Sequence, residues 1–187
     1  MEAKNLIFLR IRFLVIFPMI LFVFLACNES KERSETTQTI GMMDDSLINY
    51  NQQIVQKESQ EIEDFIDRYQ WKMNTTTTGL RYMIYKPGKG PYAKKGELVR
   101  ISYSVRLLNG DLVYKSDSLF PFEFEIGKRR VPNGLEEGVI LMKPGERAKF
   151  VVPSYLAFGL AGDQDRVPPR AILVYDVELL GIKRANK

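Results

Sequence analysis

Histidine is absent from this chain of 187 residues, and cysteine and tryptophan each occur once. Without histidine, the chain cannot form a Ser-His-Asp or Cys-His nucleophile system, or hold zinc or haem through imidazole. A single cysteine excludes an intrachain disulfide and a metal site built from several thiolates. Apolar residues make up 45% of the chain, enough to fill the core of one ordinary domain. We therefore expect a function that needs neither a metal nor a cofactor.

Residues 1–27 have the pattern of a bacterial export signal. Three basic residues precede an apolar run, residues 13–26, whose 14 residues fall short of the roughly 20 that span a bilayer. The run ends in Cys27 and resembles a lipobox, which makes Cys27 the lipidated first residue of a mature protein anchored to a membrane of the cell envelope, facing the periplasm. Phe24 and Leu25 match the motif imperfectly, so an ordinary secretory signal or an uncleaved anchor stays open.

Charge is divided unevenly along the rest of the chain. Residues 28–71 carry 10 acidic and 4 basic residues, whereas residues 72–187 carry 20 basic and 12 acidic residues, a net charge of +8. The positive excess would be solvated surface, or would meet an acidic partner protein or lipid headgroups. No segment interleaves basic and aromatic residues as nucleic-acid-binding motifs do, so we expect no nucleic-acid partner.

Two segments are predicted ahead of residue 79. Residues 28–43 are rich in Ser, Thr and Glu and have little to bury, which predicts a polar tether. Residues 44–73 predict an amphipathic helix, because apolar residues recur on one face at helical spacing. The members of this stripe are Ile54, Val55, Ile62, Phe65, Ile66 and Tyr69. The stripe would pack on the following domain, or would pair with the same helix of a second copy in a homodimer.

From residue 79 to 183 the apolar period changes from 3.6 to two residues, which predicts strands. Alternating segments occur at residues 80–84, 99–107, 112–116, 122–126 and 150–152. Asn109-Gly110 predicts a hairpin turn, and residues 172–182, apolar on both sides, predict a central strand. One helix is expected at residues 132–141. The segment is thus predicted to be an α+β domain, an antiparallel sheet of about five strands with one short helix.

Five blocks of sequence carry a resemblance to a known family. They are residues 99–110, 122–128 (FEFEIGK), 134–138 (GLEEG), 142–153 (MKPGERAKFVVP) and 167–180 (VPPRAILVYDVELL). Residues 79–182 are similar to FKBP-type peptidyl-prolyl cis-trans isomerases. The resemblance implies a curved antiparallel sheet wrapped round one short helix, and catalysed rotation about X–Pro bonds in proline-containing protein substrates. The leader and the acidic helical extension resemble more narrowly the gliding-motility-associated isomerase lipoproteins of Bacteroidetes, whose role would be in the folding of exported or envelope proteins.

The resemblance also implies an apolar pocket for proline. Its expected principal residues are Tyr103, Tyr114, Phe122, Val131, Leu135, Phe158 and Tyr175. Leu135 stands where the family usually has Trp, and Phe158 where it often has a hydrogen-bonding Tyr. Weaker substrate contacts are expected from Lys115, Pro132 and Val167. Lys115 replaces the usual Asp, and Pro132 has no N–H to offer a substrate carbonyl.

These departures leave two functions open. Each lost donor is worth about 0.5–1.5 kcal/mol of binding, so we expect an isomerase of reduced activity with low affinity for the macrolide inhibitors of the family. The alternative is a non-catalytic chaperone or scaffold module that keeps the fold and is anchored to the membrane. Retained aromatic walls favour the enzyme, and the lost donors favour the module.

Overall fold

The computed structural model describes residues 30–117 and 119–184. The chain divides into two compact units, residues 1–53 and 54–187. The expected export signal with Cys27 lies outside the described residues. Within those residues, no helix combines the length and the apolar character needed to cross a membrane.

Helix α2 runs from Ser30 to Arg68. It starts well before residue 44, so residues 30–43, which were expected as a tether, are helical. The segment has no proline, and extending a helix that already exists is far easier than nucleating one. The helix ends where Gln70 adopts a left-handed backbone (φ 54°) and the Trp71 N–H bonds back to the Ile66 carbonyl at 3.1 Å.

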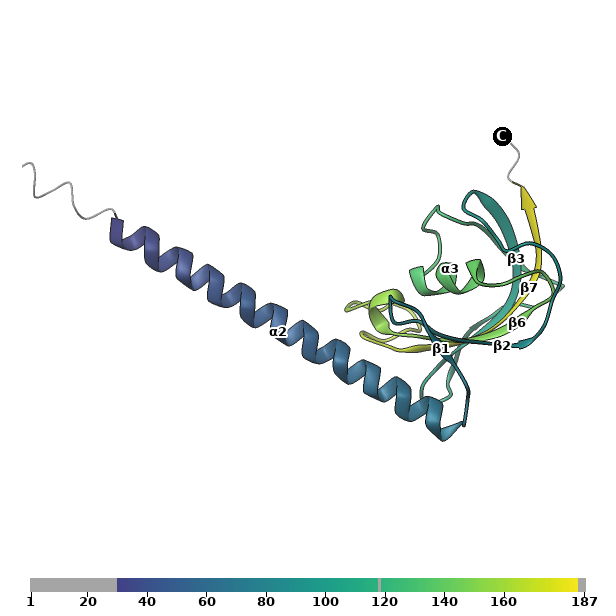
Figure 1. Cartoon of the computed structure of the whole chain (residues 1–187), viewed down its shortest axis with the longest axis horizontal. Helices are drawn as coiled ribbons and strands as arrows, with labels where there is room; N and C mark the ends of the chain where they lie inside the picture. Colours follow the sequence, from purple (N-terminus) through teal and green to yellow (C-terminus); the bar gives the residue numbers. More distant parts are fainter. Residues whose placement is uncertain (1–29, 118, 185–187) are drawn as a thin grey trace, which may run out of the picture. The chain divides into compact units, whose positions relative to one another are not determined.

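The second unit contains one antiparallel sheet, in the strand order β1-β2-β6-β7-β3-β4, with β5 also paired to β3. The strands are β1 (Asn74–Thr75), β2 (Arg81–Lys86), β3 (Glu97–Leu107), β4 (Leu112–Lys115), β5 (Phe122–Glu125), β6 (Arg147–Val152) and β7 (Leu173–Arg184). The sheet curves round the short helix α3 (Asn133–Ile140), as Figure 1 shows. The predicted fold class is confirmed, and β7 is central because it pairs with both β3 and β6.

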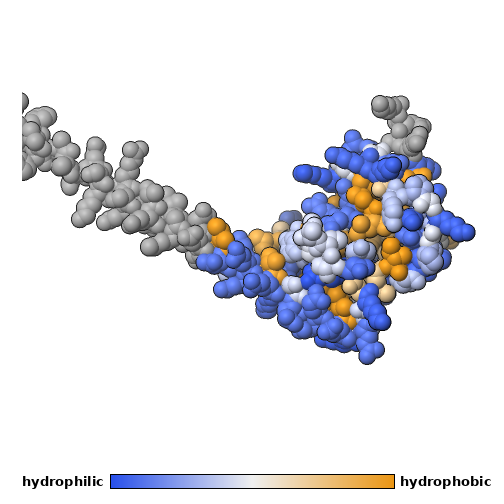
Figure 2. Space-filling model, in the orientation of Figure 1, coloured by the Kyte–Doolittle hydropathy of each residue, from blue (hydrophilic) through white to orange (hydrophobic). Residues whose placement is uncertain are grey.

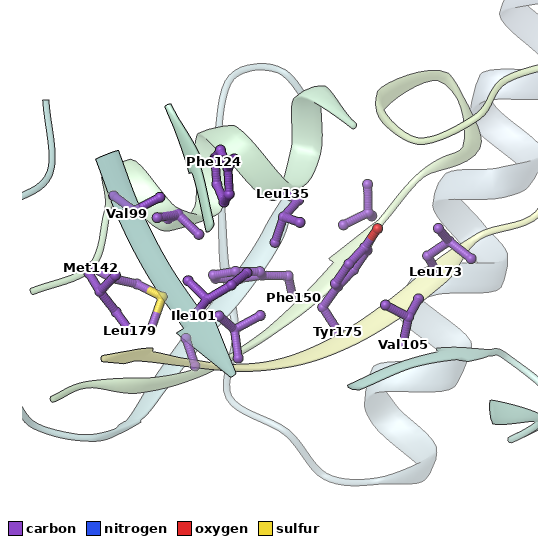
Figure 3. Packing of buried hydrophobic residues seen from close by; sticks show 14 of the residues in the cluster. Val99, Ile101, Val105, Phe124, Leu135, Met142, Phe150, Leu173, Tyr175 and Leu179 are labelled. Carbon is purple, nitrogen blue, oxygen red and sulfur yellow. The ribbon is translucent and has the colours of Figure 1, made fainter. Parts of the chain in front are cut away.

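Both faces of the central strands are covered, which explains why β7 is apolar on both sides. On one face, Tyr175 of β7 packs in a large cluster with Leu135 of α3 (Figure 3). On the other face, its neighbour Val174 packs in a second cluster with Ile62 and Phe65 of α2. Because neighbouring side chains on a strand point to opposite faces, each helix meets its own set of residues. The central part of the predicted stripe therefore packs on the sheet.

A buried carboxylate fastens α2 to the segment that leads into the concave face. Glu58 is only 7% exposed and accepts hydrogen bonds from the Ser154 hydroxyl at 2.6 Å and the Ser154 N–H at 3.0 Å. Ser154 opens the short 3₁₀ helix η1 (Ser154–Leu156). A buried carboxylate is tolerated when its oxygens are hydrogen-bonded, so this contact holds the start of η1 in place. Ala157 and Phe158 follow directly.

Candidate functional site

The concave face of the sheet holds a cavity of about 450 Å³. Its size falls in the range of pockets that take small molecules, roughly 300–1,000 Å³. The lining comes from four strands, the segment before α3, α3 itself and the residues after η1: Tyr103, Val105, Tyr114, Phe122, Arg129, Arg130, Val131, Pro132, Leu135, Ala157, Phe158 and Tyr175.

Eight of the ten residues expected from the sequence meet in this cavity: Tyr103, Tyr114, Phe122, Val131, Pro132, Leu135, Phe158 and Tyr175. Lys115 and Val167 are not among the lining residues. Lys115 follows Tyr114 on β4 and is exposed, because alternate residues of a strand face opposite sides. Val167 is buried in the main core cluster.

Aromatic rings form one wall of the cavity. The rings of Tyr103 and Phe122 meet edge to face, with centroids 5.7 Å apart and planes 70° apart. Their strands are fixed in register, since Ile101 of β3 lies opposite Phe122 of β5 and Val105 of β3 opposite Tyr175 of β7. Packed ring edges resist rotation, so the wall has a defined shape that suits a flat apolar ring.

The edge of the cavity beside the start of α3, called the lip below, lacks a backbone N–H donor at Pro132. Pro132 is the N-cap of α3, and its carbonyl accepts the N–H groups of Leu135 and Glu136, both at 3.1 Å. Its nitrogen carries no hydrogen. Phe158, which also lines the cavity, carries no hydroxyl. Both departures noted in the sequence therefore fall on the surface of the cavity.

Asp163 is a polar residue of this region that the sequence did not single out. It accepts a hydrogen bond from the Tyr114 hydroxyl, and its other oxygen accepts the N–H groups of Asp165, Arg166 and Val167 at 2.7–3.0 Å. Desolvation acts to raise the pKa of Asp163, but these hydrogen bonds outweigh it and lower the pKa to about 2. The bond to Asp163 raises the pKa of Tyr114 to about 12. An Asp whose oxygen accepts N–H groups two to four residues later is a local turn signal that could have identified the loop.

Burial acts on two further phenols of the cavity. Desolvation raises the pKa of Tyr103 and that of Tyr175. Both phenols therefore keep their protons at neutral pH and remain hydrogen-bond donors.

The neighbouring carboxylates of α3 do not form an acid–base pair. Glu136 accepts the N–H of Gly127 at 3.0 Å, whereas Glu137 accepts the Thr78 hydroxyl at 2.7 and 2.8 Å. Neither glutamate lines the cavity. Among the residues that the structure describes, no three Asp, Glu or Cys side chains gather as a metal site would require. The cavity can thus bind an apolar group, exclude water from it and donate hydrogen bonds.

Known proteins share both the sequence and the fold of this region. The sequence pattern of the FKBP-type peptidyl-prolyl cis-trans isomerases matches residues 90–180, which include every residue that lines the cavity. FK506-binding protein 2 of Dictyostelium discoideum is 42% identical over 90 residues, which make up 48% of this chain and 68% of that protein. The chain belongs to the FKBP-type peptidyl-prolyl cis-trans isomerase family.

Other members of the family differ in how much of them the chain covers. FK506-binding protein 4 of Dictyostelium discoideum is 39% identical over 106 residues, 57% of this chain but only 29% of that protein. The chain thus spans less than a third of this longer relative. The crystal structure of FkpA from Escherichia coli matches with a TM-score of 0.62 and 29% sequence identity, over 86% of this chain and 76% of FkpA. The shared fold therefore extends beyond the segment that the family pattern matches.

Proposed function

We propose that the protein is a peptidyl-prolyl cis-trans isomerase that accelerates rotation about X–Pro bonds in protein substrates. The observation that carries this proposal is the cavity itself, in which aromatic and aliphatic walls from distant segments enclose a space that suits a proline ring. Family membership points to the same reaction. We place the isomerase domain at residues 79–183.

The proposed mechanism requires no nucleophile. Rotation is slow because it breaks amide resonance, at a barrier of about 18–20 kcal/mol. The twisted amide has less charge separation than either planar isomer, so a cavity that excludes water favours it. The packed rings of Tyr103 and Phe122 give the walls a fixed shape, which can fit the twisted proline better than the planar forms. Such preferential binding of the transition state lowers the barrier.

The chain offers a second candidate function, a non-catalytic chaperone or scaffold module. Two observations favour it: the nitrogen of Pro132 cannot donate to a substrate, and large apolar side chains are exposed near the cavity residues in sequence. Leu119 and Phe120 precede Phe122 and are 82% and 79% exposed. Figure 2 shows hydrophobic patches at the surface between hydrophilic ones. Such surface would suit unfolded clients.

A refolding assay separates the two functions. A protein whose refolding is limited by proline isomerisation is mixed with a substoichiometric amount of the full chain in detergent, and Tyr103→Ala serves as the control. We expect acceleration by the native chain and none by the variant. Retained client binding without any acceleration would support the chaperone module instead.

We further propose that Cys27 carries the lipid that anchors the protein in the bacterial cell envelope, facing the periplasm. The support is the charged and apolar pattern of residues 1–27 and the small residue before the cysteine. Palmitate should label the native chain, and Cys27→Ser should abolish the labelling. If the native chain takes up no palmitate, the leader is an ordinary secretory signal or an uncleaved anchor.

A role in gliding motility rests on the likeness of the whole layout to the Bacteroidetes lipoproteins, and we propose it on that basis. Deletion of the gene in a gliding strain tests this role.

We also propose that residues 44–73 form the interface of a homodimer. Leu47 and Ile48 of α2 are 59% and 48% exposed, which leaves apolar surface for a second copy. Light scattering of the chain with both residues changed to Gln tests the dimer, and an unchanged mass would refute it.

A further inference from the structure

Two hydroxyl groups of the cavity have no hydrogen-bond partner among the described residues. They belong to Tyr103 of β3 and Tyr175 of β7, which both line the cavity. The hydroxyl of Tyr114, by contrast, donates to Asp163, and that of Tyr155 to the carbonyl of Thr78 at 3.0 Å. Two tyrosines of the site are thus left with unused donors, while their neighbours are satisfied.

The position of Tyr175 makes its free hydroxyl unusual. The residue is only 3% exposed, and its ring rises from β7 on the side of the sheet that carries Leu135 (Figure 3). Buried polar groups are nearly always hydrogen-bonded, because an unmade bond has a high cost in free energy. Its oxygen is not among the fully enclosed atoms that lack a partner, so it is open to the cavity. A group bound in the cavity can reach it.

The two hydroxyls belong to one face of the sheet. Tyr175 lies opposite Val105, and Tyr103 is two residues from Val105 on the same strand, so the tyrosines are diagonal neighbours. Tyr103 also contributes electrostatically to the raised pKa of Tyr175, as expected for phenols that lie close together. Both rings therefore rise from neighbouring positions on the same face of the sheet.

Other donors in the lining are few. Pro132 has no N–H and Phe158 no hydroxyl, so these two lining positions lack the donors that a peptide carbonyl would need. Arg129 and Arg130 carry donors, but both side chains are exposed. Among the tyrosine hydroxyls of the described lining, those of Tyr103 and Tyr175 are the unused ones.

We propose that the hydroxyls of Tyr103 and Tyr175 donate hydrogen bonds to a carbonyl oxygen of the bound proline peptide. This inference rests on the proposed isomerase function and names the donors that anchor its substrate. In this proposal the two sheet tyrosines hold the substrate carbonyl, in place of the positions before α3 (Pro132) and after η1 (Phe158), which lack a donor. The carbonyl meant is one outside the rotating X–Pro bond, which is held equally in the planar and twisted states, so the bonds tighten substrate binding rather than speed the rotation itself.

Conservative variants test the donors in the full chain. Tyr175→Phe and Tyr103→Phe remove one oxygen each and leave the ring. Tyr82→Phe is the matched control, because Tyr82 of β2 is a half-buried tyrosine on the same core, lacks a hydroxyl partner among the described residues and does not line the cavity. The probe is the peptide Ala-Leu-Pro-Phe. Its Kd comes from titration, and kcat and KM come from NMR exchange measurements.

We expect each cavity variant to raise Kd and KM about two- to tenfold, with kcat unchanged, as the loss of one hydrogen bond predicts. Tyr82→Phe should leave all three values as in the native chain. The melting temperature should hold or rise in Tyr175→Phe, because an unpaired buried hydroxyl does not stabilise the folded state. A structural role would lower the melting temperature instead. Adding Phe158→Tyr to Tyr175→Phe should restore part of the affinity from the other side of the cavity.

The outcomes that overturn the inference are distinct from those that overturn the proposed function. If the native chain binds and isomerises the peptide and both variants do the same with equal constants, the donors are wrong and the isomerase stands. A fall in kcat at unchanged Kd would also refute anchoring. If the native chain neither binds nor isomerises the peptide, the proposed function fails, and this inference fails with it.

Discussion

Ile62 offers a direct test of whether α2 is an integral part of the isomerase domain. Its side chain is completely buried against the sheet. Ile62→Ala removes three carbons from a packed site, a change that lowers the free energy of unfolding by about 2–5 kcal/mol. Ile48→Ala makes the same deletion on the same helix where the side chain is 48% exposed, and should lower the free energy by less than about 0.5 kcal/mol.

The structure supplies the reporter for this experiment. Trp71 is the single tryptophan of the chain, and its ring centroid lies 5.6 Å from that of Phe65 within the same cluster. Urea unfolding followed by tryptophan fluorescence therefore reads the junction between α2 and the sheet. With a slope of about 2 kcal/mol per molar urea, the midpoint should fall by roughly 1–2.5 M for Ile62→Ala. Equal midpoints for the two variants would show that the helix adds nothing to the domain.

Three further predictions concern the site and its support. Pro132→Ile restores an N–H at the lip and should raise kcat/KM up to about tenfold in the peptide assay; an unchanged value would mean that this nitrogen does not face the substrate. A Cβ on Gly138 would come within 2.6 Å of the Phe150 ring, so Gly138→Ala should lose about 1–3 kcal/mol to overpacking, more than the 0.5–1 kcal/mol gained in helix propensity. Thermal unfolding measures the net loss, and a rise in melting temperature would contradict it. The pKa of Asp163 lies near 2, below its ordinary value of 3.8, so its contribution to stability should be complete above pH 4 and disappear as the pH falls through 2. Asp163→Asn should flatten that part of the curve of stability against pH, and an identical curve would show that the bond from Tyr114 does not contribute.

Local patterns in the sequence predicted most of the sheet. Asn109-Gly110 turns the chain between β3 and β4, where Gly110 has a φ of 97° that suits glycine. The two-sided apolar character of residues 172–182 correctly predicted a central strand, because cover on both faces requires it. Strand β1, two residues long, was missed, since so short a pair has no periodicity to detect.

The cavity was predicted in part, and the remainder depends on contacts between distant segments. The resemblance identified most of the lining residues, but no local pattern links Tyr114 to Asp163, which lies 49 residues further on. Free hydroxyls can be recognised only once every partner of a side chain is known, so the case for Tyr103 and Tyr175 needed the structure. Lys115 was placed by alignment with an Asp of the family, and the alternation of β4 points it away from Tyr114.

The segment that matches the family pattern is smaller than the unit that folds. Residues 90–180 leave out β2, which pairs with β6, and the helix whose Glu58 binds Ser154. A recombinant fragment cut at residue 90 would expose the hydrogen-bonding edge of β6 and the apolar sheet face under α2. Open edges and bare apolar faces promote aggregation. Expression should therefore begin no later than residue 54, inside the helix, and insoluble shorter fragments would reflect the cut rather than the protein.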